Sequence, residues 1–181
     1  MKYGLKSDYE FNDSSVITPD VVMREVCDEL SEVTKGFVTG NVSEYEGQIE
    51  SYDMISEIAS ISAGIAATTK KDIQEQLGAI GERDFKYELY LTVSQVKDYK
   101  YRILFVKYPI GGYPVKVVVE QGIADELNNE EGLGYVYTVE TKEEFERFLV
   151  KIFNSKILQK VIQNLITVSK NRLLLKSNKV K

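Results

Sequence analysis

Four carboxylates lie close together in the second half of the chain, where they could hold a divalent cation or meet a basic surface. They are Asp125, Glu126, Glu130 and Glu131. Calcium sites need oxygen ligands at defined spacings, and neither nearby glycine follows the acidic positions of a calcium-binding loop. The spacing therefore predicts no metal site. We expect the four carboxylates to contact a basic surface of another protein, and the alternative is a solvated loop.

Two tyrosines, Tyr108 and Tyr113, flank a short segment with two glycines at residues 109–112. Tyrosine is favoured at binding surfaces because it offers a large contact area at a low entropy cost. Tyrosine is also a common strand residue, which explains most of the chain's twelve tyrosines. We add these two to the predicted partner-binding surface because they border a turn.

The residues needed for most catalytic and metal centres are missing from the composition. The chain has no histidine and a single cysteine, Cys27. This excludes a histidine-based triad, an imidazole base and a cluster of thiolate metal ligands. No phosphate-binding loop and no complete dinucleotide fingerprint is present. We therefore predict that the chain is not an enzyme and uses no cofactor, with a carboxylate or lysine centre as the alternative.

Charge is distributed unevenly along the chain, whose formal net charge is -5. Residues 120–146 contain one lysine and nine acidic residues, which are Glu120, Asp125, Glu126, Glu130, Glu131, Glu140, Glu143, Glu144 and Glu146. Residues 147–181 contain only basic charges. Such asymmetry indicates a charged partner surface, or acids and bases placed to suit helix dipoles. The basic segment leaves nucleic-acid binding as an alternative function.

At 181 residues, with 43% hydrophobic and 28% charged residues, the composition is typical of one soluble domain. No apolar run reaches the roughly 18 residues that span a bilayer. The first residues contain no apolar signal core, so we expect no export and no membrane partner. A single cysteine suits a reducing cytoplasm. Oligomeric state is not determined by these features.

The clearest fold signal is an α+β pattern of N-terminal helices, a four-stranded mainly antiparallel sheet and C-terminal helices. Strands are predicted over 85–93, 100–108, 113–120 and 135–140. A capping box at Thr141 and Glu144 begins a helix with Phe148 at the centre of its apolar stripe. Thr18, Pro19 and Gly36 likewise predict the start and end of a helix.

The predicted organisation is a single domain, divided into a helical region over 1–81, a sheet over 85–140, helices over 141–168 and a basic tail over 169–181. Further helices are expected to begin near Ser51 or Asp53 and after Thr69, while residues 37–48 are ambiguous. Strands over 100–108 and 113–120 carry apolar residues in both registers, so we expect both sheet faces to be covered.

These features favour a small acidic cytoplasmic protein that binds another protein, of the inhibitory, immunity, antitoxin or anti-defence kind. Residues 105–108 match the end of an RNA-recognition strand signature, but its preceding glycines are absent. Consecutive strands also do not fit the order of that fold. Nucleic acid is therefore disfavoured as the partner of the sheet.

Overall fold

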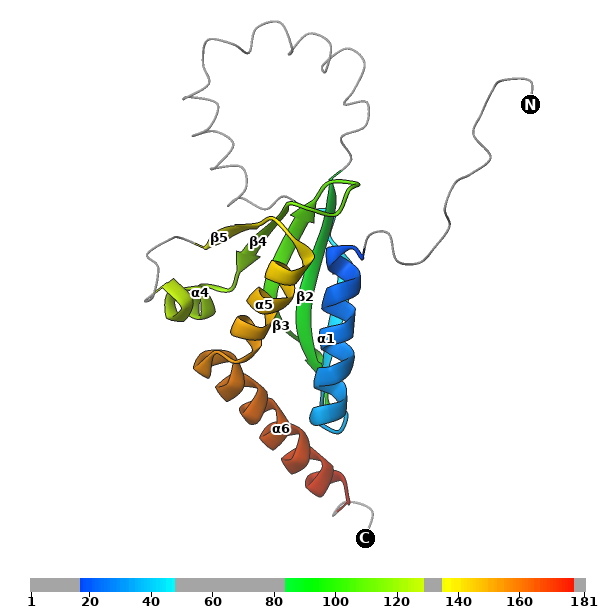
Figure 1. Cartoon of the computed structure of the whole chain (residues 1–181). Helices are drawn as coiled ribbons and strands as arrows, with labels where there is room; N and C mark the ends of the chain where they lie inside the picture. Colours follow the sequence, from blue (N-terminus) through cyan, green and yellow to red (C-terminus); the bar gives the residue numbers. More distant parts are fainter. Residues whose placement is uncertain (1–16, 48–83, 129–134, 178–181) are drawn as a thin grey trace, which may run out of the picture.

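The computed structural model of the chain describes residues 17–47, 84–128 and 135–177 (Figure 1). Helices precede and follow the strands of a five-stranded antiparallel sheet, which confirms the α+β class. In chain order the elements are α1 (Pro19–Val33), β1 (Val38–Glu44), β2 (Phe85–Val93), β3 (Val96–Tyr108), β4 (Val115–Val119), α4 (Gln121–Asn128), β5 (Val136–Val139), α5 (Lys142–Phe153) and α6 (Lys156–Ser177).

The sheet has five strands rather than the expected four, in the spatial order β1-β2-β3-β4-β5. The additional strand, β1, lies within residues 37–48, which are ambiguous from sequence, and pairs with β2 from Val38↔Val93 to Glu44↔Tyr87. Its glycine and asparagine have low strand propensity, so pairing with β2 decides its conformation. The helices expected near Ser51 and after Thr69 lie outside the described residues.

The hairpin between β2 and β3 is tighter than the sequence indicates. A turn was expected over 94–99, but β3 already begins at Val96. Asp98 has a φ of 58°, and the pairing of β2 with β3 shifts register between Leu91 and Val93. These irregularities allow polar residues to lie within the strand. The local composition therefore does not indicate where β3 begins.

Helix α1 begins and ends where its sequence predicts. Thr18 precedes it in an extended conformation, Pro19 is its first residue, and Gly36 follows its end with a φ of 71°. The face formed by Val22, Met23, Cys27 and Leu30 is buried against the sheet. Cys27 is the small buried hydrophobe expected of its position on that face, and burial raises the pKa of its thiol to about 12.

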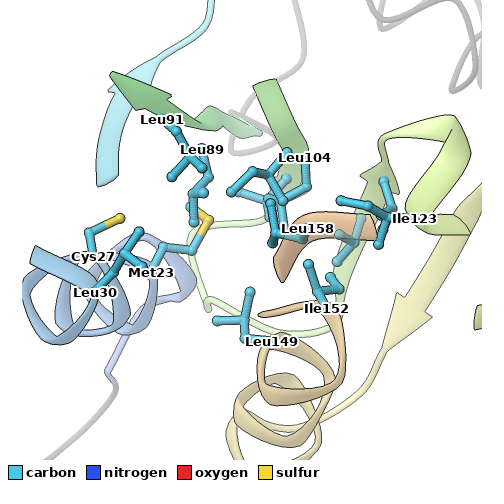
Figure 2. Close-up of a cluster of buried hydrophobic side chains, with 14 of the residues drawn as sticks. Met23, Cys27, Leu30, Leu89, Leu91, Leu104, Ile123, Leu149, Ile152 and Leu158 are labelled. Carbon is cyan, nitrogen blue, oxygen red and sulfur yellow. The ribbon is translucent and has the colours of Figure 1, made fainter. Parts of the chain in front are cut away.

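The described helices pack on one face of the sheet, which we call the covered face (Figure 1). In Figure 2 side chains from α1, α4, α5 and α6 point toward those of β2 and β3. Helix α5 buries Phe145, Leu149 and Ile152, whereas Phe148 is only half-buried and contacts Tyr137 at a ring-centroid distance of 4.8 Å. Because α1 and α5 share this face, no described helix covers the opposite face, which the sequence predicts to be covered as well.

The segment expected to be a tail from residue 169 is the end of α6, which continues to Ser177. Ser169 is fully buried, and its hydroxyl lies 3.3 Å from that of Ser94 in the β2–β3 turn. Arg172 and Lys176 donate hydrogen bonds to the backbone and side chain of Gln95. The turn thus supplies partners that local sequence does not reveal.

Candidate functional site

The face of the sheet opposite these helices, which we call the open face, is formed by alternate residues of neighbouring strands. In β4 the valines at 115, 117 and 119 are buried, whereas Lys116 is exposed and Val118 is half-buried. Because pleated strands project successive side chains to opposite sides, the pairing registers extend this division across the sheet. The open face carries Thr39, Asn41, Ser43, Tyr45, Lys86, Glu88, Tyr90, Thr92, Lys100, Arg102, Phe105, Lys107, Lys116, Val118, Val136 and Thr138.

A carboxylate, Glu88, lies at the centre of the open face and is only 5% exposed. Its oxygens accept hydrogen bonds from Arg102 Nε at 2.8 Å, from Ser43 Oγ at 3.1 Å and from Lys100 Nζ. Burial alone raises the pKa of Glu88, but these donors outweigh burial and hold the pKa below its ordinary value. Glu88 is therefore ionised at neutral pH and fixes the positions of two cations.

Aromatic rings lie beneath those same cations. Lys100 Nζ is 3.9 Å from the centroid of the Tyr90 ring. The Arg102 guanidinium carbon is 4.7 Å from the Phe105 centroid and 5.8 Å from that of Tyr45. Cations over ring faces are attracted by the ring quadrupole. Rings and carboxylate together hold the charged groups in fixed places on the sheet.

Three more lysines, Lys86, Lys107 and Lys116, complete the charge of the open face. Lys107 Nζ forms an ion pair with Asp84 at 2.7 Å, and Lys86 Nζ donates to the carbonyl of Gly47 at 3.4 Å. Among the described residues, five basic side chains thus lie on this face; Lys100 and Arg102 pair with Glu88, and Lys107 pairs with Asp84. In a protein of net charge -5, this makes the open face a basic region.

The structure describes two of the four acidic residues predicted to bind a partner. Asp125 and Glu126 lie in helix α4. Glu130 and Glu131 lie outside the described residues. Glu126 accepts hydrogen bonds from the backbone N–H groups of Lys156, at 2.7 Å, and Ile157, at 3.0 Å. Glu126 therefore caps the start of α6. It lies in a helix, and its carboxylate is already hydrogen-bonded within the protein.

This capping role predicts a pH signature for Glu126→Gln. The two N–H donors hold the pKa of Glu126 below its ordinary value, so the ionised carboxylate stabilises the fold. That stabilisation is complete above the unfolded pKa of about 4.3 and is lost as pH falls through the lower folded pKa. We expect Glu126→Gln to lower the melting temperature at neutral pH, and this deficit to shrink toward about pH 3. Asp125→Asn, at an exposed neighbour in the same helix, is the control and should show no such narrowing.

The two tyrosines predicted to bind a partner pack against other residues of the same chain. Tyr108 is 3% exposed, and its hydroxyl donates to Asp20 Oδ1 at 2.6 Å, which ties β3 to the start of α1. Burial and this hydrogen bond raise the pKa of Tyr108. Tyr108 is therefore a core residue with almost no surface to offer a partner.

Tyr113 is half-buried, with its ring edge against Phe145 at 6.4 Å between centroids. Its hydroxyl oxygen is buried and has no hydrogen-bond partner among the described residues. Burial, reinforced by the nearby charges of Glu146 and Glu143, raises the pKa of Tyr113 to about 12. Of the six residues predicted to bind a partner, Tyr108 contacts α1, Tyr113 contacts α5 and Glu126 contacts the start of α6, while Glu130 and Glu131 lie outside the described residues.

Comparisons of the chain with protein-family models, with curated proteins and with solved structures found no match. Within the described ranges, no group of three or more His, Cys, Asp or Glu side chains is arranged to hold a metal ion. A search of the same ranges for a helix long and apolar enough to cross a membrane also found none. Function is therefore inferred from the geometry of the surfaces.

Sequence reasoning missed the open face as a site although its signal was present. The alternation of β2 places Lys86, Glu88 and Tyr90 on one side. Their partners in β3 are offset by the register shift between Leu89 and Tyr90, so composition alone does not pair Glu88 with Arg102. A search for basic and aromatic residues at every second position of successive strands would have found this surface.

Proposed function

We propose that this chain is a protein-binding module whose open face contacts an acidic surface of another protein. The observation that carries the proposal is the cationic and aromatic character of that face, which no described helix covers. Charge complementarity of this kind accelerates encounter and selects partners. Arginine and aromatic side chains are also the residue types that most often dominate interface energies.

The proposal places the contact on the open face rather than on the acidic segment. Glu126 is engaged by the start of α6, so reversing its charge would disturb the fold as well as any interface. On the open face, in contrast, Lys100 and Arg102 are held in place by Glu88 and by ring contacts. A surface whose charged groups are already ordered loses less side-chain entropy when it binds.

We further propose that binding is inhibitory, as expected of a small cytoplasmic protein of the immunity, antitoxin or anti-defence kind. A sheet face backed by α1 and α5 is a stiff surface, suited to covering a functional surface of the partner. The buried and protonated thiol of Cys27 is compatible with a reducing compartment. Inhibition in this form needs only complementary contact and no reaction.

Single-stranded nucleic acid is the competing ligand class for a basic sheet with aromatic rings. Such binding depends on bases stacking on open ring faces. On this sheet Lys100 lies over the ring of Tyr90, and Arg102 lies over the ring of Phe105. Because those faces are occupied, the geometry favours a protein partner.

The test measures how poly-L-glutamate, an acidic polypeptide probe, binds to the full chain across a salt series. Replacing Lys86, Lys107 and Lys116 together with glutamine should weaken binding roughly tenfold, since each exposed charge pair contributes about 0.2–1 kcal/mol. The slope of affinity against salt should flatten as well. Calorimetry at several salt concentrations gives both quantities.

The matched control makes the same change in net charge on the helical side, by replacing Lys35, Lys156 and Lys160 with glutamine. This control should bind the probe as the native chain does. Equal losses for the two triple variants would contradict the proposal, because binding would then follow overall charge. A single-stranded oligo-dT that bound the open face more tightly than poly-L-glutamate would also contradict it.

A further inference from the structure

Strand β5 forms one edge of the sheet, and half of its backbone groups point away from β4. Val119 N–H donates to the carbonyl of Tyr135 at 3.1 Å, and Glu120 N–H donates to Ile103 in β3. Because hydrogen-bonded pairs alternate along antiparallel strands, residues 137 and 139 bond to β4. The N–H and C=O groups of Val136 and Thr138 therefore point outward, and within the described structure no strand pairs with them.

A pocket of about 380 Å³ lies beside this edge, between β5, α5 and the end of α4. Figure 1 shows β5 at the edge of the sheet, with α4 and α5 bordering the same region. The pocket is lined by Leu127, Asn128, Tyr137, Thr138, Val139, Glu144, Arg147, Phe148 and Lys151. The half-buried rings of Tyr137 and Phe148 make part of its lining apolar.

The charged groups of this pocket favour a negatively charged occupant. Arg147 and Lys151 are separated by one helical turn and therefore share a face of α5. Glu144, the acidic residue of the lining, accepts a hydrogen bond from Glu140 N–H at 3.2 Å and belongs to the capping box. The two cations are thus positioned to meet a carboxylate that enters along β5.

We propose that the groove between β5 and α5 binds an extended peptide of another protein as a sixth strand. The peptide's backbone pairs with the outward groups of Val136 and Thr138, in the manner of strand addition at a sheet edge. One apolar side chain of the peptide packs on Phe148. An acidic side chain two residues later lies on the same side of the added strand and meets Arg147 or Lys151.

This groove uses the backbone edge of β5 and the side chains of α5 rather than the basic side chains of the open face, and it recognises a linear segment rather than a folded acidic face. The probes are fluorescein-labelled peptides, and the first has the sequence Ser-Val-Phe-Val-Asp-Ser. A second peptide replaces aspartate with asparagine, and a third, Ser-Val-Phe-Asp-Val-Ser, moves the carboxylate to the opposite side of the strand. Fluorescence polarisation with the full chain should show binding about tenfold weaker for the second and third peptides than for the first.

Variants of the chain separate backbone pairing from charge. Thr138→Pro removes an outward N–H, which an edge strand tolerates, and should weaken binding of the first peptide about tenfold. Thr138→Ala keeps that N–H and should bind normally. Arg147→Glu, on the exposed side of α5, should weaken the first peptide but leave the weaker second peptide unchanged.

Unchanged binding to both Thr138→Pro and Arg147→Glu would overturn the proposal, as would equal binding of the three peptides. Displacement of the peptide by oligo-dT would replace it with a nucleic-acid site. The triple lysine variant of the open face should bind the first peptide as the native chain does. A wrong prediction for one surface can therefore be recognised independently of the prediction for the other.

Discussion

Phe145→Ala is expected to lower the free energy of unfolding by about 3–5 kcal/mol, the usual loss for a large aromatic core residue. Phe145 is fully buried in α5 and contacts the ring of Tyr113 across the covered face. Alanine would leave a cavity between helix and sheet that the surrounding strands can fill only in part. Urea unfolding followed by circular dichroism measures the difference.

Phe148→Ala is the matched comparison within the same helix. The sequence places Phe148 at the centre of the apolar stripe, but in the structure it is half-buried and borders the groove beside Tyr137. Its replacement should therefore cost clearly less than that of Phe145. An equal or larger loss at Phe148 would show that α5 is rotated relative to the sheet.

Gly40→Ala is expected to destabilise the protein by about 1–3 kcal/mol, the range for forcing extra volume into a packed core. A β-carbon at Gly40 would lie 2.5 Å from Cys27 Sγ and 3.0 Å from the backbone Cα of Cys27. Because one of these atoms is backbone, α1 and β1 must move apart. Thermal unfolding of the native and variant chains measures the cost.

Gly111→Ala provides the control for this substitution. A β-carbon there would meet nothing within 4 Å, so stability should stay within about 0.5 kcal/mol of the native value. If Gly40→Ala were equally neutral, the close packing of α1 on β1 would be wrong. The position of α1 on the sheet would then be wrong as well.

The starts of two helices, α1 and α5, could be predicted from local sequence signals. Thr18, Pro19 and Gly36 delimit α1, and the Thr141 capping box begins α5, because capping is a local interaction. Strand β1 is ambiguous from sequence because its glycine is required by a helix residue thirteen positions earlier, Cys27. That requirement exists only after α1 has packed on the sheet.

The candidate sites depended even more on tertiary contacts. Glu126 resembles a solvated loop residue until the start of α6, thirty positions later, is placed against it. From sequence Tyr108 resembles a surface tyrosine beside a turn. In the structure its hydroxyl donates a hydrogen bond to Asp20, in a helix distant in sequence. In contrast, the alternation that assigns Lys86 and Tyr90 to one face of β2 is local, and the structure confirms it.

Binding of an acidic partner by the open face is tested by mapping the contact with nuclear magnetic resonance. The amide spectrum of the ¹⁵N-labelled full chain is recorded while poly-L-glutamate is added. We expect the largest shifts at the open-face residues of β2, β3 and β4, around Arg102 and Lys116, and we expect these shifts to diminish as salt is raised. Shifts concentrated on the basic residues of α6, with β2 and β3 unchanged, would contradict this proposal.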